Sequence, residues 1–524
     1  MRMNLLDKVI HYINPVKGQE RFQARVSVAA ASSFTGASRS KGALKGWFTS
    51  RKPADEDINP ELDELRARSR DLERNNALAH GAINTKAVYV VGTGLRPEPN
   101  IDYEFLGLTS EEAETLQGQI AREFNLVAES READIARRKT FYQKQFELYH
   151  SSKVNGDAFL LLPYLNRADF PYQTKFQSIE SDRVSNPNLQ RDDEKYSAGF
   201  QLDRYGAIKG IHIKTKIGNK PTWRYVPLFA SNGRPNVLIA SNKNTRASQT
   251  RGIPDLSPVI EVIKQCGRYV DAELMAAVIS SKFTVFVKSS SPEAADAFAP
   301  NAGGASHFDD EAEEKISEER PEYRLGDGLV VQLDEDESIE TANPGRPNAV
   351  FDPFVTVLWK HMGAALGIPF EILVKHFSAS YSASKAALLQ FAHFIAVDRA
   401  NLVVDICQPY YETIIAEAVA NGRLHMPGFL NDLLIRKAYT RALWHGPVLG
   451  DIDEVKAANA AEKRLNIGIS THEVETRRLL GHDWDQINQR RIIEERKKYK
   501  PTTTESPATE PGFLMDEDEA QDDE

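Results

Sequence analysis

The sequence predicts an α+β fold with a mixed first half and a helical second half. Before Pro254, short runs with strand character alternate with segments whose apolar residues recur at helical spacing. A hairpin signature lies in this half, where Ala198–Asp203 and Ile208–Thr215 flank Arg204-Tyr205-Gly206. After Pro254, apolar residues recur at helical spacing over long segments. The chain has 524 residues, enough for about two to four domains and a sizeable core.

The first half combines helix and strand signals. Thr109 and Glu112 have the spacing of a helix N-cap pair, and a leucine face with intervening arginines marks the helix before them. In chain order we expect a short helix near Leu5–Tyr12, a helix over 60–85, a strand at Val88–Val91 closed by Gly92-Thr93-Gly94, a helix from Thr109, a helix over 140–153, a strand in Asp157–Leu165, the hairpin and a strand at Thr222–Pro227.

The helices of the second half are predicted mainly from residues that mark helix N-termini and C-termini. Pro258 follows a capping serine at a helix start, and Pro369 stands just beyond a helix end. In chain order we expect a helix over 255–283, an extended segment at Phe283–Lys288, a flexible acidic insert at 289–320, a strand at Gly328–Leu333, a helix from Asp352-Pro353 to Gly367, a loop over 367–381, a long helix from Ser382 to Ala420 kinked at Pro409, and helical structure from Asn431 to Lys500.

Charge is distributed unevenly along the chain. The net charge of −10 argues against a general nucleic-acid coat. Residues 1–52 hold ten Lys or Arg and two acids, whereas residues 503–524 hold nine acids and no Lys or Arg. Oppositely charged ends are typical of disordered or interacting arms. We therefore expect a basic N-terminal arm and a disordered acidic C-terminal tail.

The positions of the cysteines and the lengths of the apolar runs exclude further classes of protein. Cys266 and Cys407 lie far apart inside apolar helical patterns, which predicts two buried thiols and excludes a disulfide framework or a cysteine metal cluster. No window approaches about 20 apolar residues without charge, so we expect no membrane span. The N-terminus shows no secretory signal pattern.

One short motif raises the question of catalysis. Ser382-Ala383-Ser384-Lys385 fits the S-x-x-K spacing of some serine acylases, which also need S-D-N and K-T-G motifs. Neither motif occurs, and a serine between a loop and a strong helical pattern serves well as an N-cap. A serine hydrolase using Ser382 and Lys385 remains an alternative, but we expect Ser382 to start a helix.

Other candidate sites also have simpler structural explanations. Gly92-x-Gly94-x-x-Pro97 lacks the third glycine and the helix that would hold a dinucleotide. His472-Glu473 lacks a second histidine at zinc spacing, and the acid runs Asp309–Glu314 and Asp334–Glu337 are typical of solvated surface. We therefore expect no catalytic, cofactor-binding or metal-binding residues, and no enzyme activity.

Four arginines could instead meet a phosphate backbone. They are Arg66, Arg68, Arg70 and Arg74. Because they lie on several faces of one predicted helix, the pattern favours ion pairs with neighbouring acids.

Several sequence segments stand in a recognisable order. They are R-x-R-S-R-D-L-x-R-N-N at 66–76 with V-V-G-T-G-L at 90–95, R-G-I-P at 251–254, A-L-G-I-P-x-E-x-L at 365–373, and Y-S-A-S-K-A-A-L at 381–388. Together they resemble the lambda family of tailed-phage portal proteins over roughly residues 45–490. Lys385 stands where that family often has Arg, and Ser380 where it often has Asn.

The resemblance implies a portal fold with an α/β wing, a helical stem, a small α/β clip, a long kinked helix and a helical crown. The expected parts are a basic arm (1–52), the wing (53–254), a stem helix (255–283), the clip with its flexible insert (284–350), a returning stem helix (351–366), a tunnel loop (367–381), a long wing helix (382–430), the crown (431–500) and an acidic tail (501–524).

The resemblance also implies a function. It implies a ring, usually of twelve copies, through which double-stranded DNA enters and leaves a virion, assembled in the host cytoplasm. The implied partners are terminase, the major capsid protein and scaffold, and head-completion or head-tail joining proteins. We expect Lys375, His376, Ser378 and Ser380 to face DNA, although they could instead pack the loop against the next subunit. A structural adaptor that does not act on DNA is a further alternative.

Overall fold

The computed structural model describes residues 4–30, 35–37, 42–44, 46–217, 220–242, 246–281, 285–289, 337–341, 351–377, 380–448, 450, 453–481 and 484–498. Several sequence predictions lie outside the described residues. They are nearly all of the flexible insert 289–320, the strand at Gly328–Leu333, the disordered tail 501–524 and the DNA-facing Ser378.

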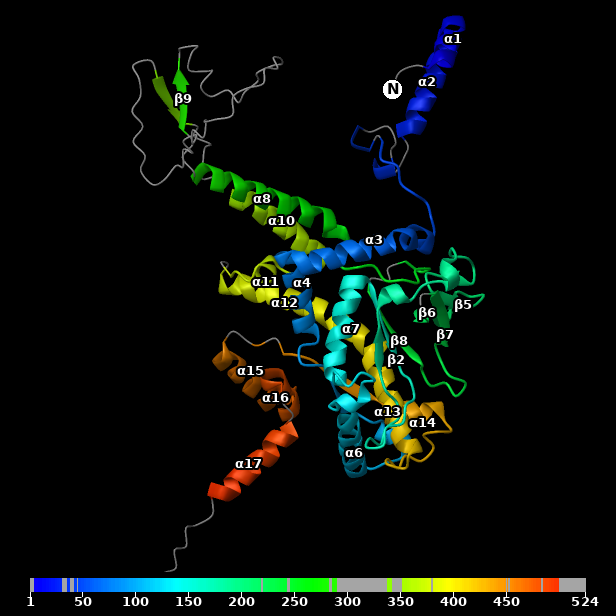
Figure 1. The fold of residues 1–524 in the computed structure, drawn as a ribbon, viewed down its shortest axis with the longest axis vertical. Helices are drawn as coiled ribbons and strands as arrows, with labels where there is room; N and C mark the ends of the chain where they lie inside the picture. Colours follow the sequence, from blue (N-terminus) through cyan, green and yellow to red (C-terminus); the bar gives the residue numbers. More distant parts are fainter. Residues whose placement is uncertain are drawn as a thin grey trace, which may run out of the picture.

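The described chain is elongated, with helical extensions around a mixed body (Figure 1). A hairpin of α1 (Leu5–Ile13) and α2 (Pro15–Ala30) lies at one end, and α15 (Glu454–Asn466), α16 (His472–Leu480) and α17 (Trp484–Lys498) lie at the other. The helix α8 (Ile260–Ser281) and the returning α10 (Phe351–Leu366) pack side by side and project from the body. Beyond them β9 (Val285–Ser289) pairs antiparallel with β10 (Glu337–Thr341).

The predicted helix over 60–85 and strand at Val88–Val91 are wrong in detail. The structure has two helices, α3 (Ala54–Asn75) and α4 (Ala77–Val90), and Asn76 caps the second by accepting from Leu78 N and Ala79 N. The valines suggested a strand because branched residues favour one. Here Val90 and Val91 are buried in the main core, and this burial outweighs the local preference.

A buried sheet forms the centre of the body. Strand β2 (Asp157–Leu161) lies between β3 (Gln177–Ile179) and β8 (Val237–Ser241), antiparallel to both, and every residue of β2 is buried. Helix α7 (Phe141–Asn155) leads into β2, and α6 (Ser110–Ala128) carries the predicted capping box at Thr109. The predicted strand in Asp157–Leu165 is confirmed, and with it the α+β class.

The predicted hairpin is confirmed in a second sheet. Its strand order is β4 (Tyr196–Ser197), β5 (Phe200–Leu202), β6 (Ile208–Ile217) and β7 (Lys220–Pro227), with antiparallel neighbours. Strand β7 includes the predicted strand at Thr222–Pro227. Phe200, Ile211 and Ile213 of this sheet pack with Phe159 in a core of their own.

We predicted helical structure from Asn431 to Lys500, and this prediction is wrong in part because the segment contains a strand. After α14 (Leu433–Tyr439), strand β11 (Ala442–His445) pairs antiparallel with β1 (Arg96–Pro99). This pairing joins segments more than 300 residues apart, so no local pattern announces it. The remaining short elements are α5 (Tyr103–Leu106) and the 3₁₀ turns Thr35–Ala37, Gly42–Leu44, Arg131–Ala133, Ser181–Arg183, Pro187–Leu189 and Ser257–Val259.

A long helical run crosses the body and completes the core. It comprises α12 (Tyr381–Leu402), a π-helical turn at Val403–Cys407 and α13 (Gln408–Ala420). The predicted irregularity is present, but it takes the form of the π turn before Pro409, a residue that cannot donate the usual backbone hydrogen bond. Phe141 stacks on the buried Tyr410 of α13 with ring centroids 4.1 Å apart.

Candidate functional site

The loop between α10 and α12 presents exposed polar side chains on a buried base. Gly367 turns the chain with a φ of +70°, and the short helix α11 (Phe370–Leu373) buries Ile372 and Leu373. Lys375 follows in the left-handed region with a φ of +56°, and His376 N donates to Glu371 O at 3.1 Å. This geometry anchors the base of the loop and leaves its tip in solvent.

Three of the four predicted DNA-facing residues are described, and all three are exposed. Lys375 and His376 lie at the tip, and Ser380 lies where the loop enters α12. Figure 1 shows α11 beside the N-terminal part of α12 at the left of the body, which places this loop at one edge. The prediction that these residues face DNA is not tested by a single chain.

The helix that was predicted to start at Ser382 starts one residue earlier, with Ser380 as its cap. The Ser380 side chain accepts from Ala383 N at 3.4 Å, whereas Ser382 is an exposed residue inside the first turn. The Lys385 ammonium lies over the Tyr381 ring, 6.0 Å from its centroid. The S-x-x-K spacing is therefore accounted for by the start of a helix.

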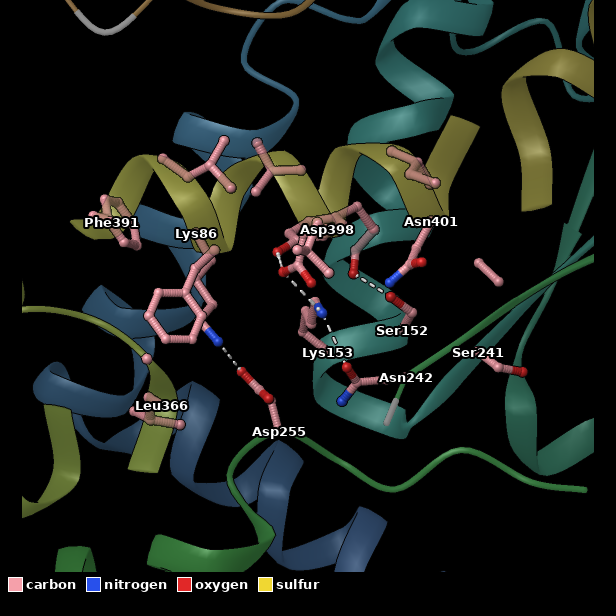
Figure 2. Close-up of a pocket in the computed structure, with 18 of the residues that line it drawn as sticks. Lys86, Ser152, Lys153, Ser241, Asn242, Asp255, Leu366, Phe391, Asp398 and Asn401 are labelled. Carbon is pink, nitrogen blue, oxygen red and sulfur yellow. Dashed lines mark hydrogen bonds and ion pairs between the residues drawn. The ribbon is translucent and has the colours of Figure 1, made fainter. Parts of the chain in front are cut away.

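A cavity of about 500 Å³, here called the junction cavity, lies where α4, α7, α10, α12 and β8 meet (Figure 2). Lys86 Nζ donates to Asp255 Oδ2 at 2.6 Å. Lys153 Nζ donates to Asn242 Oδ1 at 2.9 Å and lies 3.0 Å from Asp398 Oδ2, which also accepts from Tyr149 OH at 2.6 Å. Burial and the neighbouring Asp398 carboxylate raise the pKa of Tyr149, so this phenol stays a hydrogen-bond donor.

A second buried network fixes the sheet to the helices around it. Asp157 at the start of β2 accepts from both Arg66 of α3 and Arg251, at distances from 2.6 to 3.3 Å. Burial alone would raise the pKa of Asp157, but the two guanidinium groups lower it. Burial lowers the pKa of Arg66 to about 10. We call Arg66, Asp157 and Arg251 the buried triad.

Three of the four arginines that the sequence analysis singled out in α3 bind acids, as predicted. Arg66 binds Asp157, Arg70 binds Asp182, and Arg68 lies 2.8 Å from Glu64. By contrast, sequence reasoning missed the cavity residues Lys86, Lys153, Asp255 and Asp398. Each is a single charged residue in a helical or loop segment, and only the tertiary fold pairs them.

The long helical run also bears on membrane association. Tyr381–Ala420 is long and apolar enough to span a membrane by length and composition alone, whereas the sequence led us to expect no span. Its charged residues contact the body, since Asp398 binds Tyr149 and Lys153 while Arg399 donates to the carbonyl oxygens of Tyr89 and Val90. The middle of this run is thus held in the body. Among the described residues, no cluster of His, Cys, Asp and Glu could hold a metal ion.

Comparison with known proteins places this architecture among phage portal proteins. The model of the family described as "Phage portal protein, lambda family" matches residues 40–399, more than half of the chain, and the chain belongs to that family. Proteins of this family are structural components of virions.

Relatives match over most of their length. The portal protein of Escherichia phage N15 is 24% identical over 92% of this chain and 94% of that protein. Portal protein B of Escherichia phage lambda is 23% identical over 92% of this chain and 93% of that protein. Among solved structures, a chain in the virion of a native gene transfer agent particle aligns over 80% of this chain and 93% of its own, at 11% identity and a TM-score of 0.41. Another, in the C12-symmetric neck of that particle, has a TM-score of 0.36 at 10% identity and aligns over 78% of this chain and 92% of its own.

Proposed function

We propose that copies of this chain form a closed ring at one capsid vertex, and that double-stranded DNA is packaged and ejected through its central channel. The observation that carries the proposal is the apolar side chains left exposed on three helices, α8, α10 and α12. These residues are Val270, Leu274, Met275 and Val278 of α8, Phe354 and Val357 of α10, and Leu389, Phe394 and Val397 of α12. Several large apolar side chains exposed on one helix mark an interface, and in a ring each copy meets the next through two different faces.

The parts of a portal correspond to the described elements. In this proposal α8 and α10 are the stem, β9 and β10 belong to the clip, and α15, α16 and α17 form the crown. The sheets with α3–α7 and the long helical run form the wing. Terminase and later the head-tail joining proteins would bind the clip, and the capsid shell and scaffold would surround the wing during assembly in the host cytoplasm.

The exposed loop would form the inner lip of the channel. Lys375, His376 and Ser380 supply a few donors for phosphates, and we place Ser378 with them. A strongly basic channel would gain counterion-release free energy at every phosphate and hold the DNA in place. A ring of copies that each carry a net charge of −10 avoids this grip and lets the duplex slide.

The mass of the purified particle tests ring assembly. Twelve copies of 58.6 kDa give about 700 kDa, which mass photometry measures directly. Electron micrographs of the same sample should show a central hole. A sample that contains only single chains at micromolar concentration would contradict the proposal.

The role of the loop needs a separate test. The double variant Lys375→Ala, His376→Ala should assemble into rings of unchanged mass but package DNA more slowly in a defined packaging reaction. A matched control is Lys209→Ala, a cation in the hairpin sheet far from the loop. Normal packaging by the loop variant would show that these side chains do not act on DNA.

A further inference from the structure

An acidic hollow lies next to the junction cavity. Its volume is about 1000 Å³, and we call it the acidic hollow. Besides Asp405, which also lines the junction cavity, five carboxylates line it: Asp55, Glu56, Asp192, Asp193 and Glu194. Both hollows are also lined by Ser241, Asn401 and Asp405. Because they share these residues, the two hollows meet and form one groove.

The carboxylates of the acidic hollow are positioned by neutral donors. Asp55 accepts from Thr250 N at 2.9 Å and from Ser197 Oγ at 2.6 Å. Asp192 accepts from the amides of Asn59 and Asn186, each at 2.7 Å. Within the part of the chain that the structure describes, no Lys, Arg or His forms an ion pair with any of the five acids. The hollow therefore keeps a negative potential that favours a cationic occupant.

At the other end of the groove, in the junction cavity, Lys86 and Lys153 are paired with acids and most of the exposed lining is apolar. Leu366, Phe391 and Ile395 line the junction cavity as buried side chains. Phe394 and Val397 line it too, with 50% and 61% of their surface exposed. The groove thus combines an apolar end with an anionic end, which suits a peptide that carries aromatic side chains beside cations.

The N-terminal arm of this chain has that composition. Residues 38–52 contain Trp47 and Phe48 together with five cations, Arg39, Lys41, Lys45, Arg51 and Lys52, and no acid. Trp47 and Phe48 are 72% and 95% exposed. The arm joins the body at Pro53, which itself lines the acidic hollow, and Figure 1 shows α1 and α2 standing clear of the body.

We propose that residues 38–48 of one copy bind in the groove of the adjacent copy, with Trp47 and Phe48 at the apolar end and Arg39, Lys41 and Lys45 against the carboxylates, while Lys52 stays on its own body, where its carbonyl oxygen accepts from Arg246. This inference rests on the proposed ring, which brings a second groove alongside. The arm leads away from its own body, and an extended segment of 15 residues reaches up to about 50 Å. The arm would then act as a strap between subunits.

Disulfide capture in mixed rings tests the strap. Full-length Phe48→Cys chains are co-expressed with differently tagged Ser248→Cys chains, since Ser248 lines the acidic hollow. The native Cys266 and Cys407 are buried and contribute little background. After mild oxidation we expect a covalent dimer that carries both tags. The pairing of Phe48→Cys with Glu111→Cys, on the exposed side of α6, is the matched control and should give none.

The outcomes separate the strap from the ring. Rings of normal mass without the mixed dimer would overturn the strap and leave the proposed function intact. A third sample uses chains that carry both Phe48→Cys and Ser248→Cys. A crosslink that forms only within such a chain would also overturn the strap, because the arm would then bind its own body. Failure to form rings would count against the proposed function itself.

Charge reversal gives a second readout. Glu56→Lys with Glu194→Lys should raise the rate of chymotrypsin cleavage at Trp47 and Phe48 severalfold in assembled rings. The compensating Lys41→Glu with Lys45→Glu should restore protection. Glu111→Lys with Glu114→Lys is the matched control and should leave the rate unchanged. An equal cleavage rate in all rings would refute charge-guided binding of the arm.

Discussion

At the scale of single residues, the buried triad is the group of charges that depends most on exact pairing. One carboxylate, Asp157, balances two buried guanidinium groups from segments almost 200 residues apart. Arg251 is 1% exposed and also donates to the carbonyl oxygens of Val184 and Ser181. Buried ions are tolerated only when they are paired and hydrogen-bonded, so each member depends on the others.

Asp157→Asn tests this dependence. The amide leaves buried Arg251 without its carboxylate and Arg66 with only the exposed Asp63, 3.9 Å away, and we expect the free energy of unfolding to fall by about 3–5 kcal/mol. Chemical denaturation followed by circular dichroism measures the loss. The exposed pair Arg68–Glu64 is the matched control, since Arg68→Gln should cost at most about 1 kcal/mol. Equal effects from the two substitutions would contradict the role of the triad.

A second residue-scale prediction separates a helix cap from a nucleophile. Ser380→Ala should destabilise the protein by about 0.5–2 kcal/mol, because the first turn of α12 loses its cap. Ser382→Ala should change stability by less than about 0.5 kcal/mol and leave function intact. Thermal unfolding of both variants measures the difference. Loss of function in Ser382→Ala at unchanged stability would revive the hydrolase alternative.

At the scale of elements, a carboxyl pair links helix α16 to the β1–β11 ribbon. Glu98 of β1 accepts from His445 of β11 at 2.6 Å and also binds Arg477 of α16. Glu473 of α16 shares a hydrogen bond with Glu98, and this bond, aided by burial, raises the pKa of Glu473 to about 7. Burial opposes ionisation of Glu98, but His445, Glu473 and Arg477 together lower its pKa to about 2.

The attachment of α16 should therefore weaken as pH rises. The pKa of Glu473 is about 7 in the folded chain, against an ordinary value of 4.5, so its contribution to stability is complete below pH 4.5 and is lost as pH rises through about 7. Glu98 titrates well below this window. Hydrogen exchange of α16 amides, corrected for intrinsic rates, should show protection falling from pH 5 to pH 8.

Glu473→Gln should remove this pH dependence, because the amide keeps a donor toward Glu98 at every pH. Glu454→Gln on the neighbouring α15 is the matched control and should behave like the natural chain. The same pH profile in Glu473→Gln and the natural chain would contradict the account.

Much of the order of helices and strands could be predicted from the sequence. The elements that were predicted wrongly share one cause. Local signals located the Thr109 capping box, the hairpin around Tyr205 and the helix before Gly367, and the structure confirms them. The β1–β11 pairing and the helical state of Val88–Val90 depend on contacts distant in sequence. The loop was located as a segment between helices, whereas the charged pairs of the junction cavity appear only when α4, α7 and α12 are brought together.

At the scale of the whole molecule, three helices carry apolar side chains that a single chain leaves exposed. This exposure indicates that the chain is one subunit of a larger assembly. The main core binds the wing helices to the buried sheet, yet α8, α10 and α12 keep large apolar side chains in solvent. In a ring these residues would be buried between copies, which contributes about 25 cal/mol for each Å² removed from water. Assembly would then complete the burial that folding of one chain leaves open.

Charges placed on α12 and on the π-helical turn that follows it should block assembly without unfolding the chain. Val397→Glu with Val404→Glu alters side chains that are 61% and 70% exposed, so we expect a normal unfolding transition but single chains in place of rings. Mass photometry at matched concentration measures the change. Tyr205→Glu, at the tip of the hairpin and 78% exposed, is the control and should still form rings. Rings of full mass from the α12 variant would show that this face lies outside the interface.

The most direct test of the central claim is a cryo-electron microscopy reconstruction of the assembled protein. The account predicts a ring with an open channel, in which α8 and α10 of adjacent copies pack together and residues 367–381 of every copy line the narrowest part. A closed particle without a channel, or a ring whose 367–381 loops lie on the outer surface, would contradict it.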